Sequence, residues 1–232
     1  MDEQIQVRDV LIDAWKIARK LARNGLIVAM LLTVSFTGTD VLLTETIQLG
    51  VQWVLTFVML YVQLYITGVA LSEANLAGYE YDARSPTRGR FASAFGQTII
   101  YTFGVIAGLA LLIVPGLILL VRWSVCLPAL LAEDLTIGES LKRSWDLTSR
   151  NWTPIGIVEL IIVLLWVVPA GFLIMLYPDF DAPNVSTAFF VNGLMSFTAV
   201  AAWFVTVALY AHLVQHDVAR KQFAEALPSA AA

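Results

Sequence analysis

Charged side chains are scarce in this sequence. Asp, Glu, Lys and Arg make up 14% of the 232 residues, whereas soluble domains carry about 25%. Apolar residues reach 59% and the mean hydropathy is +0.76, so a soluble globular fold is excluded. The net charge of −4 provides no basic field, which excludes nucleic acid as a partner.

Cysteine and histidine are also rare. The single Cys126 cannot form an internal disulfide. His212 and His216 have the i, i+4 spacing of two metal ligands, but no further histidine or cysteine completes a metal site with them. Ser140 and Ser144 have no histidine base close in the sequence, so nucleophilic catalysis lacks its partner. We therefore expect no metal, no cofactor and no catalytic residue.

Long hydrophobic runs dominate the chain. Five stretches contain no Asp, Glu, Lys or Arg, namely residues 24–39, 46–72, 91–121, 160–178 and 182–216. A bilayer core of about 30 Å needs roughly 20 apolar residues in a helix. The third stretch stays apolar past Arg122 to Ala132. A single helix over residues 94–132 would measure about 58 Å, twice the thickness of the core, so this stretch is too long for one span.

The middle of this long stretch carries a proline and a glycine. Pro115 lacks a backbone donor and disfavours helix at the residue before it, and Gly116 tolerates a turn. We predict a tight hairpin at Pro115-Gly116, and with it an all-α bundle of six transmembrane spans. A Pro-kinked single helix with five spans in all is the alternative. The six predicted spans are residues 22–39, 48–71, 94–114, 116–132, 153–176 and 187–211.

The basic residues decide between six spans and five. Lys and Arg collect on the cytoplasmic side of membrane proteins. With six spans, thirteen of the 14 basic residues fall in segments on one side of the membrane, and Arg122 lies within a span. With five spans, Lys142, Arg143 and Arg150 fall on the opposite side. We therefore predict six spans with the N- and C-termini in the cytoplasm.

Two cytoplasmic segments have amphipathic helical periodicity. Over residues 4–21, apolar residues recur at three- and four-residue spacing with charged residues between them. This pattern predicts a helix on the membrane surface with Trp15 at headgroup depth. A longer, tilted first span is the alternative.

The second amphipathic segment covers residues 136–149. Thr136 and Glu139 have the spacing of a capping box, and an apolar stripe follows at i, i+4, i+8. We expect this helix to lie flat on the anionic inner leaflet, unless it is an ordinary connecting helix packed on the bundle. The residues expected to contact the leaflet are Lys142, Arg143, Trp145 and Arg150.

Polar side chains inside the spans form the candidate functional site. Arg122 stands within the fourth span, where a lone arginine costs roughly 2.5–3.5 kcal/mol, so it is expected to face the bundle, water or a headgroup. Glu159 is the acid inside a predicted span. These two residues either bind a lipid phosphate or solute or serve the structure alone. Gln63, Gln97 and Asn192 line a polar path or, as we favour, form hydrogen bonds between helices.

The segments 115–123 (PGLILLVRW), 127–128 (LP), 133–134 (ED) and 141–148 (LKRSWDLT) resemble a known family. The family is the membrane domain attached to some glycerophosphoryl diester phosphodiesterases, together with related stand-alone inner-membrane proteins of bacteria. The resemblance implies a multi-span, all-helical protein of the bacterial inner membrane. It implies no enzyme here, because the phosphodiesterase activity of the fused relatives belongs to a separate soluble barrel domain.

We therefore expect one integral membrane domain over residues 1–232, without catalytic activity. Its expected role is to interact with membrane lipids, organise the membrane or bind a protein partner or a second copy. The alternative is a small transporter or channel for a solute or lipid that uses Arg122 and Glu159. The scarcity of polar groups in the spans and the lack of an obvious inverted repeat weigh against that alternative.

Overall fold

The computed structural model describes residues 5–43, 45–74, 87, 89–176 and 185–230, and all regular structure within them is helical. The predicted all-α class is therefore confirmed. The helices are α1 (Val7–Lys20), α2 (Ala22–Leu42), α3 (Glu45–Glu73), α4 (Phe91–Leu111), α5 (Ile113–Arg122), α6 (Cys126–Ala132), α7 (Ile137–Thr148), α8 (Trp152–Leu176) and α9 (Val185–Ala230).

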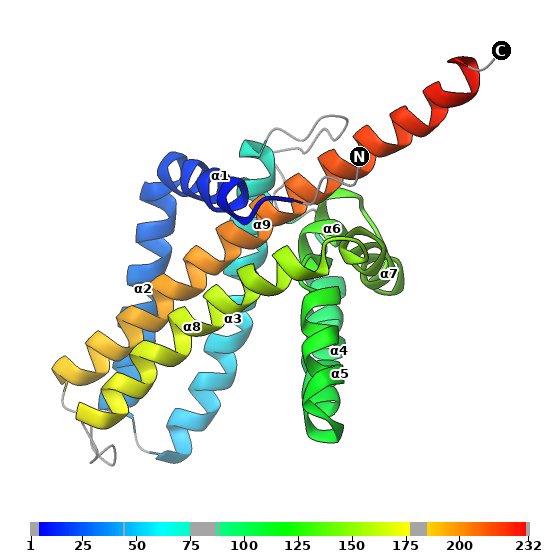
Figure 1. The fold of residues 1–232 in the computed structure, drawn as a ribbon. Helices are drawn as coiled ribbons and strands as arrows, with labels where there is room; N and C mark the ends of the chain where they lie inside the picture. Colours follow the sequence, from blue (N-terminus) through cyan, green and yellow to red (C-terminus); the bar gives the residue numbers. More distant parts are fainter. Residues whose placement is uncertain (1–4, 44, 75–86, 88, 177–184, 231–232) are drawn as a thin grey trace.

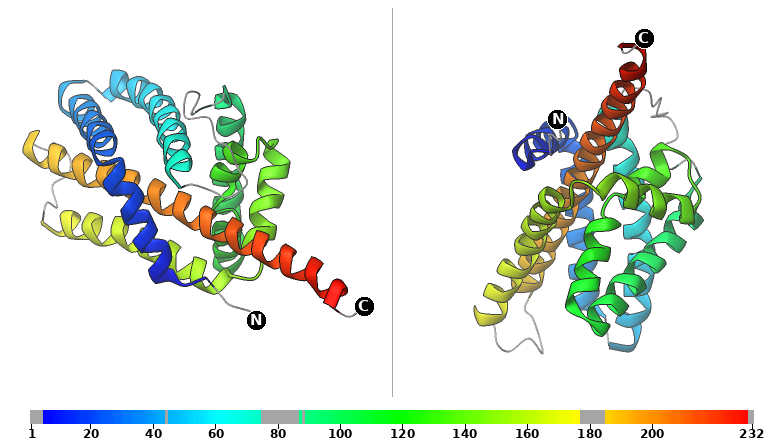
Figure 2. Two further views of the ribbon diagram at one scale, coloured as in Figure 1. Left: turned by 90° about the horizontal axis from the view of Figure 1, so that it is seen from above. Right: turned by 45° about the vertical axis from the view of Figure 1, so that its right-hand side comes forward.

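The spans are built as the hydrophobic runs predict. Within the described residues, five helical stretches are long and apolar enough to cross a membrane, in α2, α3, α4, the pair α5–α6 and α9. A shorter apolar helix over Trp152–Leu164 belongs to α8. The multi-span architecture is thus confirmed, and six spans fit it. The predicted last span, 187–211, is part of a 46-residue helix, α9, whose C-terminal end projects beyond the bundle (Figures 1 and 2).

The two ends of the bundle differ in what they carry. The helices α1, α6 and α7 lie at one end, together with the C-terminal part of α9 (Figure 1). The junction of α4 with α5 lies at the other end, with the last turns of α2 and α8 and the first turns of α3 and α9. The chain therefore reverses direction between α4 and α5, and both amphipathic helices share one end, which we call the α7 end.

The reversal occurs before the residues predicted to form it. The α4 helix ends at Leu111, Leu112 is extended (φ −158°, ψ 139°), and α5 begins at Ile113. The predicted turn at Pro115-Gly116 was therefore placed three residues too late, and both residues belong to α5. Pro115 stands in the first turn of α5, where a backbone N–H would have no helical acceptor, so it starts a helix here rather than ending one.

Glycines hold the two arms of this hairpin together. A Cβ on Gly116 would lie 2.5 Å from the backbone nitrogen of Leu109, and a Cβ on Gly108 would lie 2.9 Å from the Cα of Gly116. A Cβ on Gly104 would lie 2.5 Å from the Trp123 ring. Gly104 and Gly108 form a Gly-x-x-x-Gly pair that serves packing within the molecule, because it lets α5 approach α4 closely.

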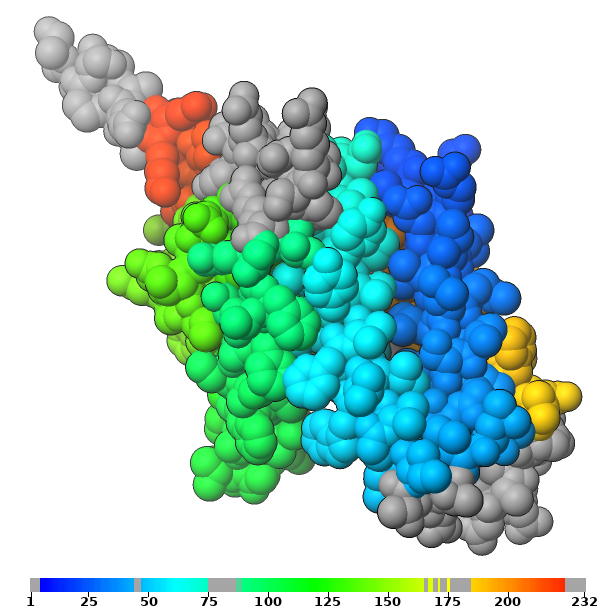
Figure 3. Space-filling model, turned by 180° about the vertical axis from the view of Figure 1, so that it is seen from behind, coloured from blue at the N-terminus to red at the C-terminus, as the bar shows by residue number. Residues whose placement is uncertain are grey.

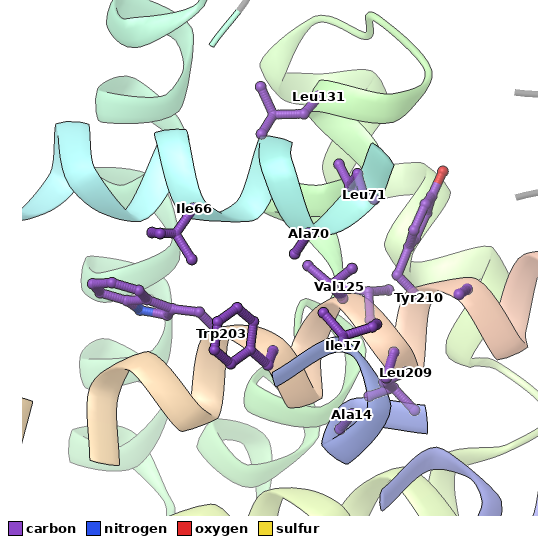
Figure 4. Close-up of a cluster of buried hydrophobic side chains, with 14 of the residues drawn as sticks. Ala14, Ile17, Ile66, Ala70, Leu71, Val125, Leu131, Trp203, Leu209 and Tyr210 are labelled. Atoms are coloured by element: carbon purple, nitrogen blue, oxygen red, sulfur yellow. The ribbon is translucent and has the colours of Figure 1, made fainter. Parts of the chain in front are cut away.

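The long helix α9 is the centre of the bundle. It contacts α1, α2, α3, α6, α7 and α8. Figure 4 shows Trp203, Leu209 and Tyr210 of α9 among side chains from α1, α3 and α6, including Ile17 and Leu131. The apolar stripe of α1 is thus turned toward the bundle, with Val10, Ala14 and Ile17 buried.

Large apolar side chains cover the outside of the spans. The face seen in Figure 3 is formed by α2, α3 and α4 side by side. Exposed residues on these helices include Leu31, Trp53, Phe57, Ile100 and Phe103. An exposed apolar surface of this extent is typical of contact with lipid, because exposing so much apolar surface to water is energetically unfavourable.

Candidate functional site

The α7 helix begins with a complete capping box. The Glu139 backbone N–H donates to the Thr136 Oγ1 at 3.4 Å, and the Thr136 backbone N–H donates to the Glu139 Oε2 at 2.9 Å. The Thr136 hydroxyl also donates to the Glu139 carboxylate, and these bonds lower the pKa of Glu139. The predicted helix start is confirmed, and it fixes which face of α7 meets the bundle.

Small polar residues form the face of α7 that packs on the bundle. Ser140, Ser144 and Thr148 are buried. The Ser144 hydroxyl donates to the backbone carbonyl of Arg122 at 2.8 Å, and the Thr148 hydroxyl lies 3.3 Å from the same oxygen. These bonds satisfy a carbonyl in the last turn of α5, where no backbone N–H of the same helix is available to donate to it. The α7 helix is therefore docked on the C-terminal end of α5.

The Arg122 side chain extends over α7. Its guanidinium carbon lies 5.2 Å from the centre of the Trp145 ring, a cation–π arrangement. The Nη1 atom is buried and has no hydrogen-bond partner among the described residues. Trp145 itself is 41% exposed. Lys142 of α7 is exposed, and so is Arg150, which lies just after the end of α7. Arg122, Trp145 and Lys142 thus define a cationic and aromatic surface, which we call the α7 face.

Arg143 does not belong to this surface, contrary to the grouping expected from the sequence. Its Nε donates to the Glu133 carboxylate at 2.9 and 3.0 Å, and its Nη1 donates to Asp217 Oδ2 at 3.0 Å. The side chain is only 20% exposed. Because helix positions 142 and 143 point about 100° apart, the neighbour of an exposed lysine faces the bundle.

A buried polar network surrounds Arg143 and joins three helices. Tyr210 of α9 donates its hydroxyl to Glu133 Oε1 at 2.9 Å, and Lys221 approaches Asp217 to 3.0 Å. Although burial alone would lower it, the pKa of Arg143 is held above its ordinary value by Glu133 and Asp217. Sequence reasoning missed Glu133, Asp217 and Tyr210 as partners. The sequence feature that could have identified them is a pair of acids, Glu133 and Asp217, just beyond two predicted spans, on the side of the membrane where basic residues dominate.

Glu159 and Arg122 do not pair. Among the described residues no ion pair joins them, and Arg122 instead lies over Trp145. Glu159 lies within electrostatic range of Tyr101 on α4 and of Cys126 on α6. Gln97 of α4 is also close to the Cys126 thiol; it is 1% exposed, and its amide makes no hydrogen bond of ordinary geometry to the part of the chain that the structure describes. The predicted set therefore divides into Arg122 at the α7 face and Glu159 with Gln97 in the interior.

The remaining intramembrane amides differ in their roles. Asn192 of α9 donates to Asp40 Oδ2 of α2 at 2.8 Å, and Gln48 of α3 donates to Asp40 Oδ1 at 3.2 Å. This cluster joins three helices at the end opposite α7, as we favoured for Asn192. Gln63 is half-buried on α3 and is not part of it. Of the two histidines, His212 contacts Asp13 of α1 through Nε2 at 2.9 Å, whereas His216 is exposed.

Comparison with known proteins agrees with this architecture. No curated protein and no solved structure matches the chain. The family model described as the membrane domain of glycerophosphoryl diester phosphodiesterase matches residues 94–226. The match begins in α4 and includes the hairpin, the docked α7 helix and the network around Arg143. Since it covers more than half of the chain, the protein belongs to the family of glycerophosphoryl diester phosphodiesterase membrane domains.

Proposed function

We propose that this protein is a lipid-binding module of the bacterial cytoplasmic membrane, without catalytic activity, whose α7 face holds anionic phospholipid headgroups. The observation that carries the proposal is the Arg122 guanidinium over the half-exposed Trp145 ring, with its buried Nη1 unsatisfied among the described residues. An arginine presents donors in a planar fork that matches a phosphate. A headgroup phosphate at the guanidinium would satisfy that donor once the Arg122 side chain turns to expose it, because Nη1 is buried in the structure.

The surroundings of Arg122 favour a lipid over a soluble ligand. Lys142 lies one helical turn before Trp145 and is exposed. A cation close to an anionic leaflet contributes about 1 kcal/mol. Tryptophan is also enriched at the level of the headgroups. We further propose that the α7 end faces the cytoplasm, because the basic segments of the sequence share that side.

The hydroxyls of α7 support a role without catalysis. The Ser140 hydroxyl donates to the Ile137 carbonyl at 2.8 Å, and the Ser144 hydroxyl donates to the Arg122 carbonyl. Both side chains are buried and bonded to the backbone. Ser144 therefore fixes the position of α7 on α5, and Ser140 is bonded within its own helix.

A transporter or channel is the competing proposal, and Gln97 is the observation that favours it. Its buried amide would suit the wall of a polar path. A cavity between α8 and α9 points the other way, since it measures about 50 Å³ and is lined mostly by apolar residues such as Val158, Ile162 and Val205. Solute flux into proteoliposomes that is abolished by Glu159→Ala in a folded protein would favour transport over lipid binding.

The lipid proposal predicts selective loss of bound lipid. The protein is reconstituted in nanodiscs of mixed phosphatidylglycerol and phosphatidylcholine, and native mass spectrometry measures the lipids that remain bound. Arg122→Gln is expected to reduce retained phosphatidylglycerol about tenfold, the effect of losing a charge-assisted bond. Lys142→Gln is expected to reduce it about fivefold. The Arg122 backbone carbonyl, which holds α7, is unchanged by the first substitution.

Arg8→Gln is the matched control. Arg8 is an exposed basic residue of α1 at the same end of the bundle, and its substitution removes the same charge. Retention in this variant should stay near the wild-type level. Equal losses in Arg8→Gln and Arg122→Gln would show that net charge alone retains the lipid, and the assignment to the α7 face would then be wrong. Retention unchanged in Arg122→Gln would overturn it as well.

A further inference from the structure

A second candidate site lies at the α7 end, on different helices. A pocket of about 200 Å³ opens where α1, α3 and α9 meet. Its rim carries Asp13, Lys16 and Lys20 of α1, Glu73 of α3 and His212 of α9. No residue of the α7 face lines it. Its binding properties are therefore separable from those proposed for Arg122.

Charges of both signs face one another across this rim. The Lys16 ammonium lies 2.6 Å from Asp13 Oδ1, and the Lys20 ammonium lies 3.3 Å from Glu73 Oε2. His212 Nε2 lies 2.9 Å from Asp13 Oδ2. The bond from Lys16 holds the pKa of Asp13 below its ordinary value, against the effect of partial burial, and His212 contributes in the same direction. Asp13 is thus a carboxylate at neutral pH.

The floor of the pocket is apolar. Ile17 of α1 and Ala208 and Ala211 of α9 line it. Figure 4 shows Ile17 beside the buried residues of α9. The apolar span of α3 ends at Glu73, so the rim lies at the boundary between the hydrocarbon core and water. A pocket with a charged rim and an apolar floor at this depth suits a headgroup and the first part of a lipid's glycerol backbone.

The balance of charge selects among headgroups. Two lysines oppose two carboxylates, so a simple anion would meet repulsion as well as attraction. A zwitterion pairs with both signs. A quaternary ammonium is recognised by the faces of Trp, Tyr and Phe rings, and none of these lines the pocket among the described residues. A primary ammonium instead donates hydrogen bonds to carboxylates. The rim is therefore complementary to a phosphate joined to a primary amine.

We propose that this pocket binds a phosphoethanolamine group, with its phosphate at Lys16 and Lys20 and its ammonium at Asp13 and Glu73. A lysine ammonium has three donors. One carboxylate contact for each lysine is seen among the described residues, which leaves donors for the phosphate. The phosphate accepts from these remaining donors and the ammonium donates to the free lone pairs of Asp13 and Glu73, so both existing ion pairs stay in place. His212 keeps Asp13 in place from the α9 side.

The test compares three short-chain lipids that differ in the headgroup alone. Binding of dihexanoyl phosphatidylethanolamine, phosphatidylcholine and phosphatidylglycerol is measured by native mass spectrometry on the full chain carrying Arg122→Gln in detergent. This substitution removes the phosphatidylglycerol retention proposed for the α7 face and leaves the pocket intact. We expect the ethanolamine lipid to bind about tenfold more tightly than either of the others, the effect of one charge-assisted hydrogen bond. Asp13→Asn with Glu73→Gln should remove the preference for ethanolamine over choline. Lys16→Gln with Lys20→Gln should weaken binding of both.

Arg19→Gln is the control. Arg19 is exposed on α1 next to Lys20 and does not line the pocket. Ala211→Leu is a further variant that fills the floor and leaves every charge in place, and it should also weaken binding. Equal affinity for the three lipids, tighter binding of phosphatidylglycerol, or equal effects of Arg19→Gln and the double lysine variant would overturn the proposal.

A last comparison identifies the source of the group. The headgroup without acyl chains, glycerophosphoethanolamine, is tested at millimolar concentration as a competitor of the ethanolamine lipid. Full competition assigns the site to a free ligand, and its failure alongside lipid binding assigns it to a membrane lipid; both support the headgroup chemistry. Arg122→Gln should leave this binding unchanged, so the outcome is independent of the function proposed for the α7 face.

Discussion

Replacement of Arg143 by alanine is expected to lower the free energy of unfolding by about 3 kcal/mol, the size found when one partner of a buried ion pair is removed. The substitution leaves Glu133 and Asp217 facing each other, with their side chains 13% and 9% exposed. Asp217 keeps Arg220 and Lys221 as partners and Glu133 keeps the Tyr210 hydroxyl, so the unpaired charge is mainly that of Glu133. Titration of the purified protein with dodecyl sulfate in mixed micelles, followed by circular dichroism, measures the loss.

Two comparisons separate this effect from a general loss of charge. Lys142→Ala removes the neighbouring cation, which is exposed, and should change stability by less than about 0.5 kcal/mol. The loss of unfolding free energy caused by Arg143→Ala should also become smaller as the pH falls toward about 4. Protonation of one carboxylate removes the repulsion between Glu133 and Asp217. Equal deficits for Lys142→Ala and Arg143→Ala would mean that the network contributes little to stability.

The spans and the helix starts follow from local features of the sequence. Hydrophobic runs set where the helices lie, and Thr136 and Glu139, three positions apart, define the start of α7. Both signals act within a few residues and need no knowledge of the fold. The count of Lys and Arg in each segment between spans is also a local feature. It predicted correctly that the residues around α1 and α7 lie at one end of the bundle.

The partners of the charged residues depend on contacts across the fold. Arg143 meets Asp217, which is 74 positions away, and His212 meets Asp13 across 199 positions. Charge and helical periodicity indicate that Arg143 belongs to an amphipathic helix. They do not show that α9 brings an acid to it. Arg143, which was predicted to lie on the surface, is therefore mostly buried. The candidate site consists instead of Arg122, Trp145 and Lys142.

The position of the hairpin shows how one signal carries two meanings. Proline and glycine side by side are typical of turns, and residues 115–116 were predicted to be one. The same proline suits the first turn of a helix, and the same glycine suits a point where two helices touch. The structure uses both of these second meanings. Gly104 and Gly108 on the preceding arm are four positions apart, a spacing that permits this close packing.

Gly116→Ala is expected to cost about 2 to 3 kcal/mol of stability. The added Cβ would lie 2.5 Å from the backbone nitrogen of Leu109, so relief requires α4 and α5 to separate. Overpacking of this kind costs about 1–3 kcal/mol and outweighs the gain of up to about 1 kcal/mol from replacing a helical glycine. Dodecyl sulfate titration measures the loss, and hydrogen exchange should show reduced protection over residues 91–122 in particular.

The comparison of three glycines tests whether the backbone contact is the cause. Gly50 of α3 has no atom within 4 Å of an added Cβ, so Gly50→Ala should leave stability unchanged or raise it. Gly104→Ala meets the outer atoms of the Trp123 ring, and its cost should lie between the other two because a side chain can shift. If Gly104→Ala and Gly116→Ala cost the same, ring packing and backbone approach contribute equally to the hairpin. If Gly116→Ala behaves like Gly50→Ala, the close approach of α4 and α5 is absent in the membrane, and Arg122 then loses the fixed helix that carries it to the α7 face.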